Sequence, residues 1–100
     1  MIPSYNRLEI LKDSYTFIRK IYPDLPICLG LQGENLEDAF RSESQEDPLL
    51  RIVRLSQPSP TLALNKCIQS SEAKLILILD DDSIPCGNWL ENYLEAFSAE

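Results

Sequence analysis

Three consecutive acids, Asp80, Asp81 and Asp82, are the residues of this sequence best suited to chemistry. They follow the aliphatic run Leu-Ile-Leu-Ile-Leu at residues 75–79, which is typical of a strand buried on both faces of a parallel sheet. Side chains alternate along a strand, so Asp80 and Asp82 would share one face and Asp81 would point to the other. Adjacent carboxylates repel one another, and hard divalent cations take oxygen ligands of this kind. The acids therefore predict a divalent-metal site or, alternatively, a solvated acidic turn.

The composition limits the partners that such a site can serve. The chain has 100 residues, of which 44% are hydrophobic and 25% charged, as expected for one globular domain. Its net charge of −7 argues against nucleic acid or an anionic membrane surface as partner. An anionic small ligand stays possible if a metal or a helix N-terminus neutralises it locally.

The use of cysteine and histidine bears on compartment and catalysis. Three widely spaced cysteines, without a CxxC motif or any histidine, argue against a disulfide framework and a zinc site. We therefore expect a reducing, cytoplasmic setting. A triad that uses histidine is excluded within this chain. No apolar run reaches the roughly 18 residues of a membrane span, and we expect no signal peptide.

Strands and helices that alternate along the chain would position the acids. Apolar runs predict strands at residues 1–3, 25–31, 50–55 and 74–79, and we expect an exposed loop at 41–48. Apolar spacing and capping residues predict helices at 8–21, 34–40, 59–71 and after residue 88, with Ser4 or Asn6 capping the first. In the third helix we expect an apolar face at Leu62, Ala63, Cys67 and Ile68. In the last we expect buried side chains at Trp89, Leu90, Tyr93, Leu94 and Phe97. This order predicts an α/β fold with a parallel sheet and right-handed crossovers.

The expected strand order brings a second polar cluster to the acids. In the common doubly wound order 3-2-1-4, the first and fourth strands are neighbours, and ligands bind beyond their carboxyl ends. Those ends carry residues 4–7 (Ser-Tyr-Asn-Arg) and the three acids. We therefore expect a nucleoside diphosphate site, where the metal neutralises the pyrophosphate. Tyr5 would border the base or be an ordinary half-buried aromatic, and Arg7 would meet a phosphate or face solvent.

Residues 2–7 (Ile-Pro-Ser-Tyr-Asn-Arg), Asn65, residues 79–85 (Leu-Asp-Asp-Asp-Ser-Ile-Pro) and residues 89–90 (Trp-Leu) together resemble the family 2 glycosyltransferases. In that family one strand ends in a Pro-Thr/Ser-Tyr-Asn-Arg turn, and a later strand ends in a DxD motif before a Pro and a Trp-Leu helix start. The resemblance implies a single GT-A-like donor-binding domain over residues 1–100. Its fold would be a Rossmann-like three-layer α/β/α arrangement with a mainly parallel sheet, apparently truncated.

The resemblance also implies a ligand, a cofactor and a set of site residues. The ligand would be a UDP- or GDP-linked sugar, and the cofactor Mn²⁺ or Mg²⁺. Asp80 and Asp82 would hold the metal, with Asp81 as the middle residue of the motif. The implied nucleotide-sugar-binding residues are Pro3, Ser4, Tyr5, Arg7, Asp80 and Asp81.

The chain departs from the family pattern in its base-reading segment and at its C-terminal end, and its predicted first strand lacks the apolar residues that the family has before Ile-Pro. Where the family has a base-reading Asp, this chain has Leu-Gln-Gly-Glu at residues 31–34, so Gln32 or Glu34 would have to substitute. The chain also stops at Glu100, one helix after the acids. We therefore expect the N-terminal half of an inverting hexosyltransferase, without its acceptor half and catalytic base. Self-association, or pairing with the missing C-terminal half, would cover the exposed edge of the fourth strand.

Two alternative functions stay open. The first is a truncated, non-catalytic interaction module that keeps the fold without the activity. The second is a phosphatase of the haloacid dehalogenase type, with Asp80 as nucleophile and Asp82 as acid/base. That family places its motif on the first strand, whereas three β-α units precede the acids here.

Overall fold

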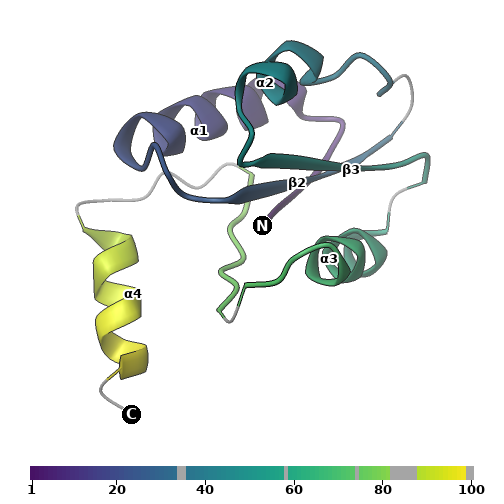
Figure 1. The fold of residues 1–100 in the computed structure, drawn as a ribbon. Coiled ribbons are helices and arrows are strands. Elements are labelled where there is room, and N and C mark those ends of the chain that lie inside the picture. The colour runs from purple at the N-terminus through teal and green to yellow at the C-terminus, as the bar shows by residue number, and fades with distance from the viewer. Residues whose placement is uncertain (34–35, 58, 74, 82–87, 99–100) are drawn as a thin grey trace.

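A parallel sheet lies at the centre of the fold. The computed structural model describes residues 1–33, 36–57, 59–73, 75–81 and 88–98. Strands β1 (Ile2–Tyr5), β2 (Ile27–Gln32) and β3 (Leu50–Leu55) pair in parallel, in the order β1-β2-β3 (Figure 1). Every residue of β2 is buried, as its central place requires.

The helices cover both faces of this sheet. Helices α1 (Leu8–Ile21) and α2 (Arg41–Glu46) lie on one face, and α3 (Pro60–Gln69) lies on the other (Figure 1). The helices after β1 and β2 thus share a face, and the chain changes face after β3. Crossovers of one hand require this change when the direction of strand addition reverses. The predicted α/β class and Rossmann-like layering are confirmed.

Helix α1 is the element that its sequence pattern describes best. Its predicted bounds are confirmed, and its apolar stripe buries Leu11, Tyr15 and Ile18 against the core. The expected capping by Ser4 or Asn6 is wrong, because the N-cap residue is Arg7 and no side chain makes a cap hydrogen bond. Ser4 lies in β1, where its hydroxyl has another partner.

Helix α3 packs unusually close to the sheet. The predicted start is confirmed, since the Ser59 hydroxyl accepts the Leu62 N–H at 3.4 Å. A Cβ added at Gly30 of β2 would lie only 3.1 Å from the Cβ of Ala63, so a glycine permits this approach. Ala63 and Cys67, one turn apart, are buried as predicted. Leu62 and Ile68, which we expected on the same face, are exposed.

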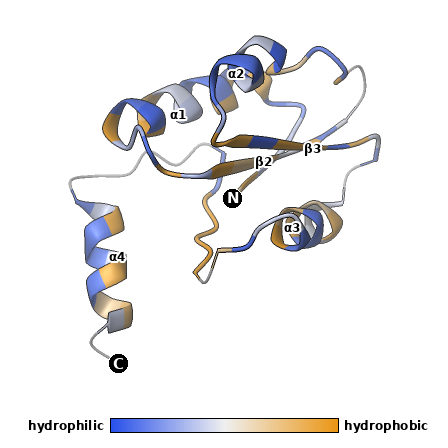
Figure 2. Cartoon of the chain, viewed as in Figure 1, coloured by the Kyte–Doolittle hydropathy of each residue, from blue (hydrophilic) through white to orange (hydrophobic). Residues whose placement is uncertain are grey.

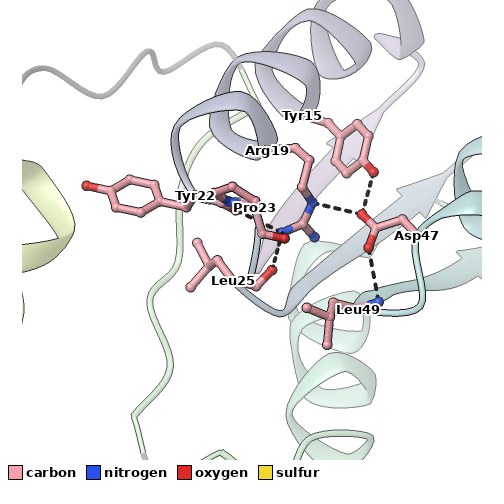
Figure 3. A network of polar contacts seen from close by, with 7 residues as sticks. All are labelled: Tyr15, Arg19, Tyr22, Pro23, Leu25, Asp47 and Leu49. Atoms are coloured by element: carbon pink, nitrogen blue, oxygen red, sulfur yellow. Dashed lines mark hydrogen bonds and ion pairs between the residues drawn. The ribbon is translucent and has the colours of Figure 1, made fainter.

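A polar network ties the amino ends of β2 and β3 to α1. Asp47 accepts the Tyr15 hydroxyl at 2.5 Å, the Arg19 Nε at 2.8 Å and the Leu49 N–H at 3.0 Å (Figure 3). Arg19 also donates through Nη1 to the carbonyl of Leu25 at 2.6 Å. The network therefore joins the end of α1 to the turns that precede two strands.

The segment 75–79 is not the regular strand that we expected. Two main-chain hydrogen bonds place it beside β1: the Met1 amine donates to Leu77 O at 2.6 Å, and the Leu79 N–H donates to Met1 O at 2.9 Å. This is the pattern of a parallel pair, on the side of β1 away from β2. After this pairing the chain turns at Asp81.

Helix α2 forms where we expected a loop. The region predicted as helix contains a turn at residues 37–40, and residues 34 and 35 lie outside the described part. Phe40 takes a left-handed conformation with φ of 60°, after which α2 begins. Its residues Arg-Ser-Glu-Ser-Gln-Glu include good helix formers, which explains why a polar segment without apolar periodicity is helical.

Helix α4 (Trp89–Ser98) begins where predicted but lies apart from the sheet (Figure 1). The expected burial of its apolar side is wrong, because Tyr93, Leu94 and Phe97 are 48–54% exposed. The first turn of α4 contacts Tyr22, whose ring centroid lies 5.7 Å from that of Trp89 and whose hydroxyl donates to Glu91 at 2.8 Å. Figure 2, coloured by residue hydropathy, shows hydrophobic residues along α4 and along the segment 75–79, and no other described element lies over α4. Among the described residues, no helix is both long enough and apolar enough to cross a membrane.

Candidate functional site

The polar end of β1 and the acids after the segment 75–79 meet at Asp81. Ser4 Oγ donates to Asp81 Oδ2 at 2.8 Å, and Arg7 Nε donates to the same oxygen at 2.9 Å. Arg7 Nη2 contacts Oδ1, which makes the ion pair bidentate. From α1, Ser14 Oγ donates to the Asp81 carbonyl at 2.7 Å. Asp81 is therefore held by β1, by the turn that follows it and by α1.

The charge of Asp81 is stabilised where it is buried. Asp81 is only 6% exposed, and this burial alone would raise the pKa of its carboxyl group. The hydrogen bonds from Arg7, with a further contribution from Ser4, instead hold the pKa of Asp81 below its usual value. Asp81 is thus ionised at neutral pH, with both carboxylate oxygens bonded to protein donors.

Asp80, the acid before Asp81, differs from it in exposure. Asp80 is exposed, and within the described part of the chain its carboxylate has no hydrogen bond or ion pair. Neighbouring acids thus differ in burial, as the predicted alternation implies. Asp82 lies outside the described residues, so its place beside Asp80 stays a prediction. The residues that the structure describes contain no group of three or more Asp, Glu or Cys placed to hold a metal.

A single free carboxylate is compatible with one kind of metal site. Mg²⁺ commonly binds through one or two carboxylates, with substrate phosphates and water completing its shell. The exposed carboxylate of Asp80 fits such a partial set of ligands. Asp81 fits it poorly, because its oxygens already accept hydrogen bonds from Arg7 and Ser4.

The carboxyl ends of β1 and β2 form the neighbouring part of the site. Tyr5, paired with Gln32, is 48% exposed at the end of β1. Asn6 takes a left-handed φ of 54°, and its N–H donates to Gln32 O at 3.3 Å. Its side chain lies where a Cβ on Gly33 would stand, and Gly33 has a φ of 133°, so a glycine is required there. Pro3 lies further back, where it pairs with Gly30 inside the sheet.

The described residues line two cavities at opposite edges of the sheet. The first, of about 440 Å³, opens beside the turn after β1 and is lined by Asn6, Arg7, Leu8, Glu9, Ile10 and Leu36. The second, of about 530 Å³, lies at the opposite edge of the sheet, where the strands begin, and contains none of the predicted site residues. Only the first cavity adjoins the polar ends of the strands.

Two residues of this region have roles that their sequence context did not reveal. Gln32, a candidate base reader, is buried, and its Oε1 accepts the Ser59 N–H at 2.7 Å, so it links β2 to the start of α3. Glu34, the other candidate, lies outside the described residues. Ser14 was not predicted at all. The sequence feature that could have revealed Ser14 is that it is a small polar residue among the buried residues of α1.

A comparison with protein families covers the whole chain. The model of Glycosyl transferase family 2 matches residues 1–100. The chain belongs to glycosyl transferase family 2. Comparison with curated proteins and with solved structures gives no match. The resemblance inferred from the two motifs is therefore confirmed, and membership of this family suggests binding of a nucleotide sugar.

Proposed function

We propose that this glycosyl transferase family 2 domain binds a nucleotide-diphospho-sugar at the carboxyl ends of β1 and β2. The contact of Asp81 with Ser4 and Arg7 carries the proposal, because it joins the two motifs at one edge of the sheet. In open α/β sheets the usual place for a ligand is beyond the carboxyl ends of the strands where the strand order reverses, and here that point lies between β1 and the segment 75–79. The adjoining cavity of about 440 Å³ supports the same location.

The proposed roles follow from the exposure of each side chain. Tyr5 has a half-exposed ring that can border a nucleobase, and Pro3 and Ser4 belong to the strand that supports it. Arg7, half exposed while bound to Asp81, orients the turn beside which the phosphates would lie. Asp81 positions this turn and is part of the nucleotide-sugar site.

We assign the divalent metal, Mn²⁺ or Mg²⁺, to Asp80 and Asp82. Asp80 is supported by its exposed carboxylate, and Asp82 by the alternation of the motif. When bound, such an ion neutralises a pyrophosphate and stabilises it as a leaving group. For the complete enzyme we propose inverting sugar transfer in the cytoplasm, with UDP or GDP as the carrier. The buried, free thiols of Cys28 and Cys67 support a reducing compartment.

Calorimetric titration tests the binding claim. UDP and GDP are titrated into the protein with and without Mn²⁺, and we expect heat of binding that depends on the metal. Asp80→Asn should abolish this dependence without lowering the unfolding midpoint, because the exposed carboxylate of Asp80 makes no hydrogen bond or ion pair with the described residues. Asp24→Asn, the same charge change at an exposed acid before β2, should bind as the parent does. Absence of metal-linked heat, or heat unchanged in both Asp80→Asn and Asp82→Ala, would sink the proposal.

A further inference from the structure

Two buried thiols face each other between β2 and α3. Cys28 and Gly30 lie two residues apart on β2 and so share its α3-facing side. Cys67 lies one turn after Ala63 on α3, and its Sγ would be 3.8 Å from a Cβ added at Gly30. Because Cys28 is on the same side of β2 as Gly30, its side chain lies close to that of Cys67, and the two thiols influence each other's ionisation. The close approach of α3 at Gly30 is what brings the two sulfur atoms together.

The two thiols are not equally accessible. Cys28 is 9% exposed and lines the cavity of about 530 Å³ at the amino edge of the sheet. Cys67 is 1% exposed and is not part of the cavity lining. Arg51, paired with Cys28 in the sheet, and Ser70 also line the cavity. A small molecule in this cavity would therefore meet Cys28 first, with Cys67 behind it.

The surroundings favour the thiolate form of Cys28. The hydrogen bond from Cys67 outweighs the effect of burial and lowers the pKa of Cys28 to about 7. The Met1 amine, the Ser70 hydroxyl and the Arg51 charge act in the same direction. The pKa of Cys67 is raised above its usual value, because its proton is shared with Cys28 and because it is buried. Thiolate is the reactive form in disulfide exchange.

We propose that Cys28 and Cys67 form a reversible dithiol–disulfide site that reacts with a small neutral disulfide entering the cavity. The Cys28 sulfur attacks one sulfur of that molecule, forming a mixed disulfide and releasing one thiolate. The released thiolate takes the proton of Cys67, whose sulfur then attacks Cys28 Sγ and releases the second thiolate, which takes a proton from water. Two electrons pass from the protein to the small disulfide, which leaves as two thiols. The product is a covalent link between β2 and α3.

This site is independent of the proposed nucleotide-sugar site, because it lies at the other edge of the sheet. The two are nevertheless connected through the same pair of elements. Gln32, four residues after Cys28 on β2, binds the main chain of Ser59 at the start of α3. A covalent link would therefore fix the helix whose first turn adjoins the nucleotide-binding edge.

The test follows the mass of the folded protein after treatment with 2-hydroxyethyl disulfide. Cys86→Ser serves as the background, since it leaves only Cys28 and Cys67. We expect this protein to lose the mass of two hydrogen atoms, without a lasting adduct and faster as the pH rises through 7. Cys67→Ser should instead accumulate one mixed disulfide, and Cys28→Ser should react at least tenfold more slowly. Thermal unfolding followed by circular dichroism verifies that each variant is folded.

Three results would overturn the proposal. The first is a lasting mixed disulfide in the Cys86→Ser protein, because Cys67 would then fail to displace the bound thiol. The second is equal reaction of Cys28→Ser and Cys67→Ser, which would remove the assigned order of attack. The third is reaction only after urea unfolds the chain, because the thiols would then be unreachable in the native state. None of these readouts depends on nucleotide binding.

Discussion

Asp81 is a buried anion whose carboxylate, among the described residues, is hydrogen-bonded by side chains of β1 and of the turn after it. Its carboxylate binds Arg7 through two hydrogen bonds and Ser4 through a third. A buried carboxylate without such donors would be strongly destabilising, so the three residues act as a unit. These three residues hold the start of α1 in place relative to the acids. The N-terminus of α1 has no side-chain cap hydrogen bond that could do this.

Replacing Asp81 by Asn should therefore destabilise the fold. The variant loses the ion pair to Arg7 and weakens the bond to Ser4, and we expect the free energy of unfolding to fall by about 1–3 kcal/mol. Urea unfolding followed by circular dichroism measures this change. Asp80→Asn is the matched control and should stay within about 0.5 kcal/mol of the parent. Equal effects of both substitutions would contradict the role given to Asp81.

The depressed pKa of Asp81 also predicts how stability depends on pH. Its value in the folded state lies below the ordinary value of 3.8, so the folded state binds this proton less readily than the unfolded state. The contribution of Asp81 is complete above that ordinary value and is lost as the pH falls through the lower, folded value. We expect the difference in unfolding free energy between the parent and Asp81→Asn to be constant from pH 6 to 7. It should shrink below about pH 4; a constant difference down to pH 2 would argue against this.

For single residues, the sequence predicted which side chains lie near the acids but not which hydrogen bonds each acid makes. Strand alternation separates Asp81 from Asp80, and the strand order brings Ser4 and Arg7 to the acids. Whether Asp80 or Asp81 accepts the hydrogen bonds of Ser4 and Arg7 depends on where the chain turns after residue 79. No pattern in the sequence specifies that turn. The sequence made Gln32 a candidate for reading the base. In the structure its side-chain carbonyl oxygen instead accepts a hydrogen bond from the Ser59 N–H.

Helix α1 has an ion pair near each of its ends, and the two pairs have different roles. Its first turn follows the Arg7–Asp81 pair at the edge of the sheet where we propose that the nucleotide binds. Near its last turn, Arg19 binds Asp47 in the network of Figure 3, which holds the turns before β2 and β3. This second pair is nearly buried, with side-chain exposures of 17% and 13%. It therefore stabilises the scaffold without approaching the site.

Asp47→Asn should lower stability and leave ligand binding intact. The substitution removes an acceptor shared by Tyr15 and Arg19, and we expect a loss of about 1–3 kcal/mol in the free energy of unfolding. The apparent Kd for UDP with Mn²⁺ should stay within twofold, measured well below the unfolding midpoint. Asp24→Asn is the control for charge in the same region. A selective loss of UDP affinity without loss of stability would contradict this division of roles.

The elements differed in how far their sequences predicted them. Periodic apolar residues located α1, and the Ser59-Pro60 pair located the start of α3. Helix α2 was missed because it buries no side chain, so the signal of an apolar face was absent. For α4 the apolar side was visible, but a pattern along one helix says nothing about what lies against it.

In the molecule as a whole, the described residues fall into a well-packed part and a loosely attached part. The sheet with α1 and α3 contains the buried core, whereas α4 buries no residue and the segment 75–79 is joined to the sheet by two main-chain hydrogen bonds. Sequence order predicted the neighbours of each strand correctly. It could not predict the extent of pairing, which depends on the length of the adjoining strand.

Hydrogen exchange should distinguish these two parts. Amides of α4 should exchange with little protection, because few buried contacts oppose local opening. Amides of β2, bonded on both sides within the core, should be protected by orders of magnitude more. Exchange of the intact protein, followed by digestion and mass spectrometry, measures both in one sample. Comparable protection of α4 and β2 would show that α4 has packing beyond its contact with Tyr22.

The pairing of Arg7 with Asp81 has a consequence for the speed of ligand capture. The positive charge at the end of β1 is already balanced, and Asp80 adds a negative charge beside it, in a chain of net charge −7. A nucleotide diphosphate approaching without its cation is therefore repelled at long range instead of being steered inward. Added salt screens that repulsion and should accelerate association, the reverse of what a basic nucleotide-binding groove would do.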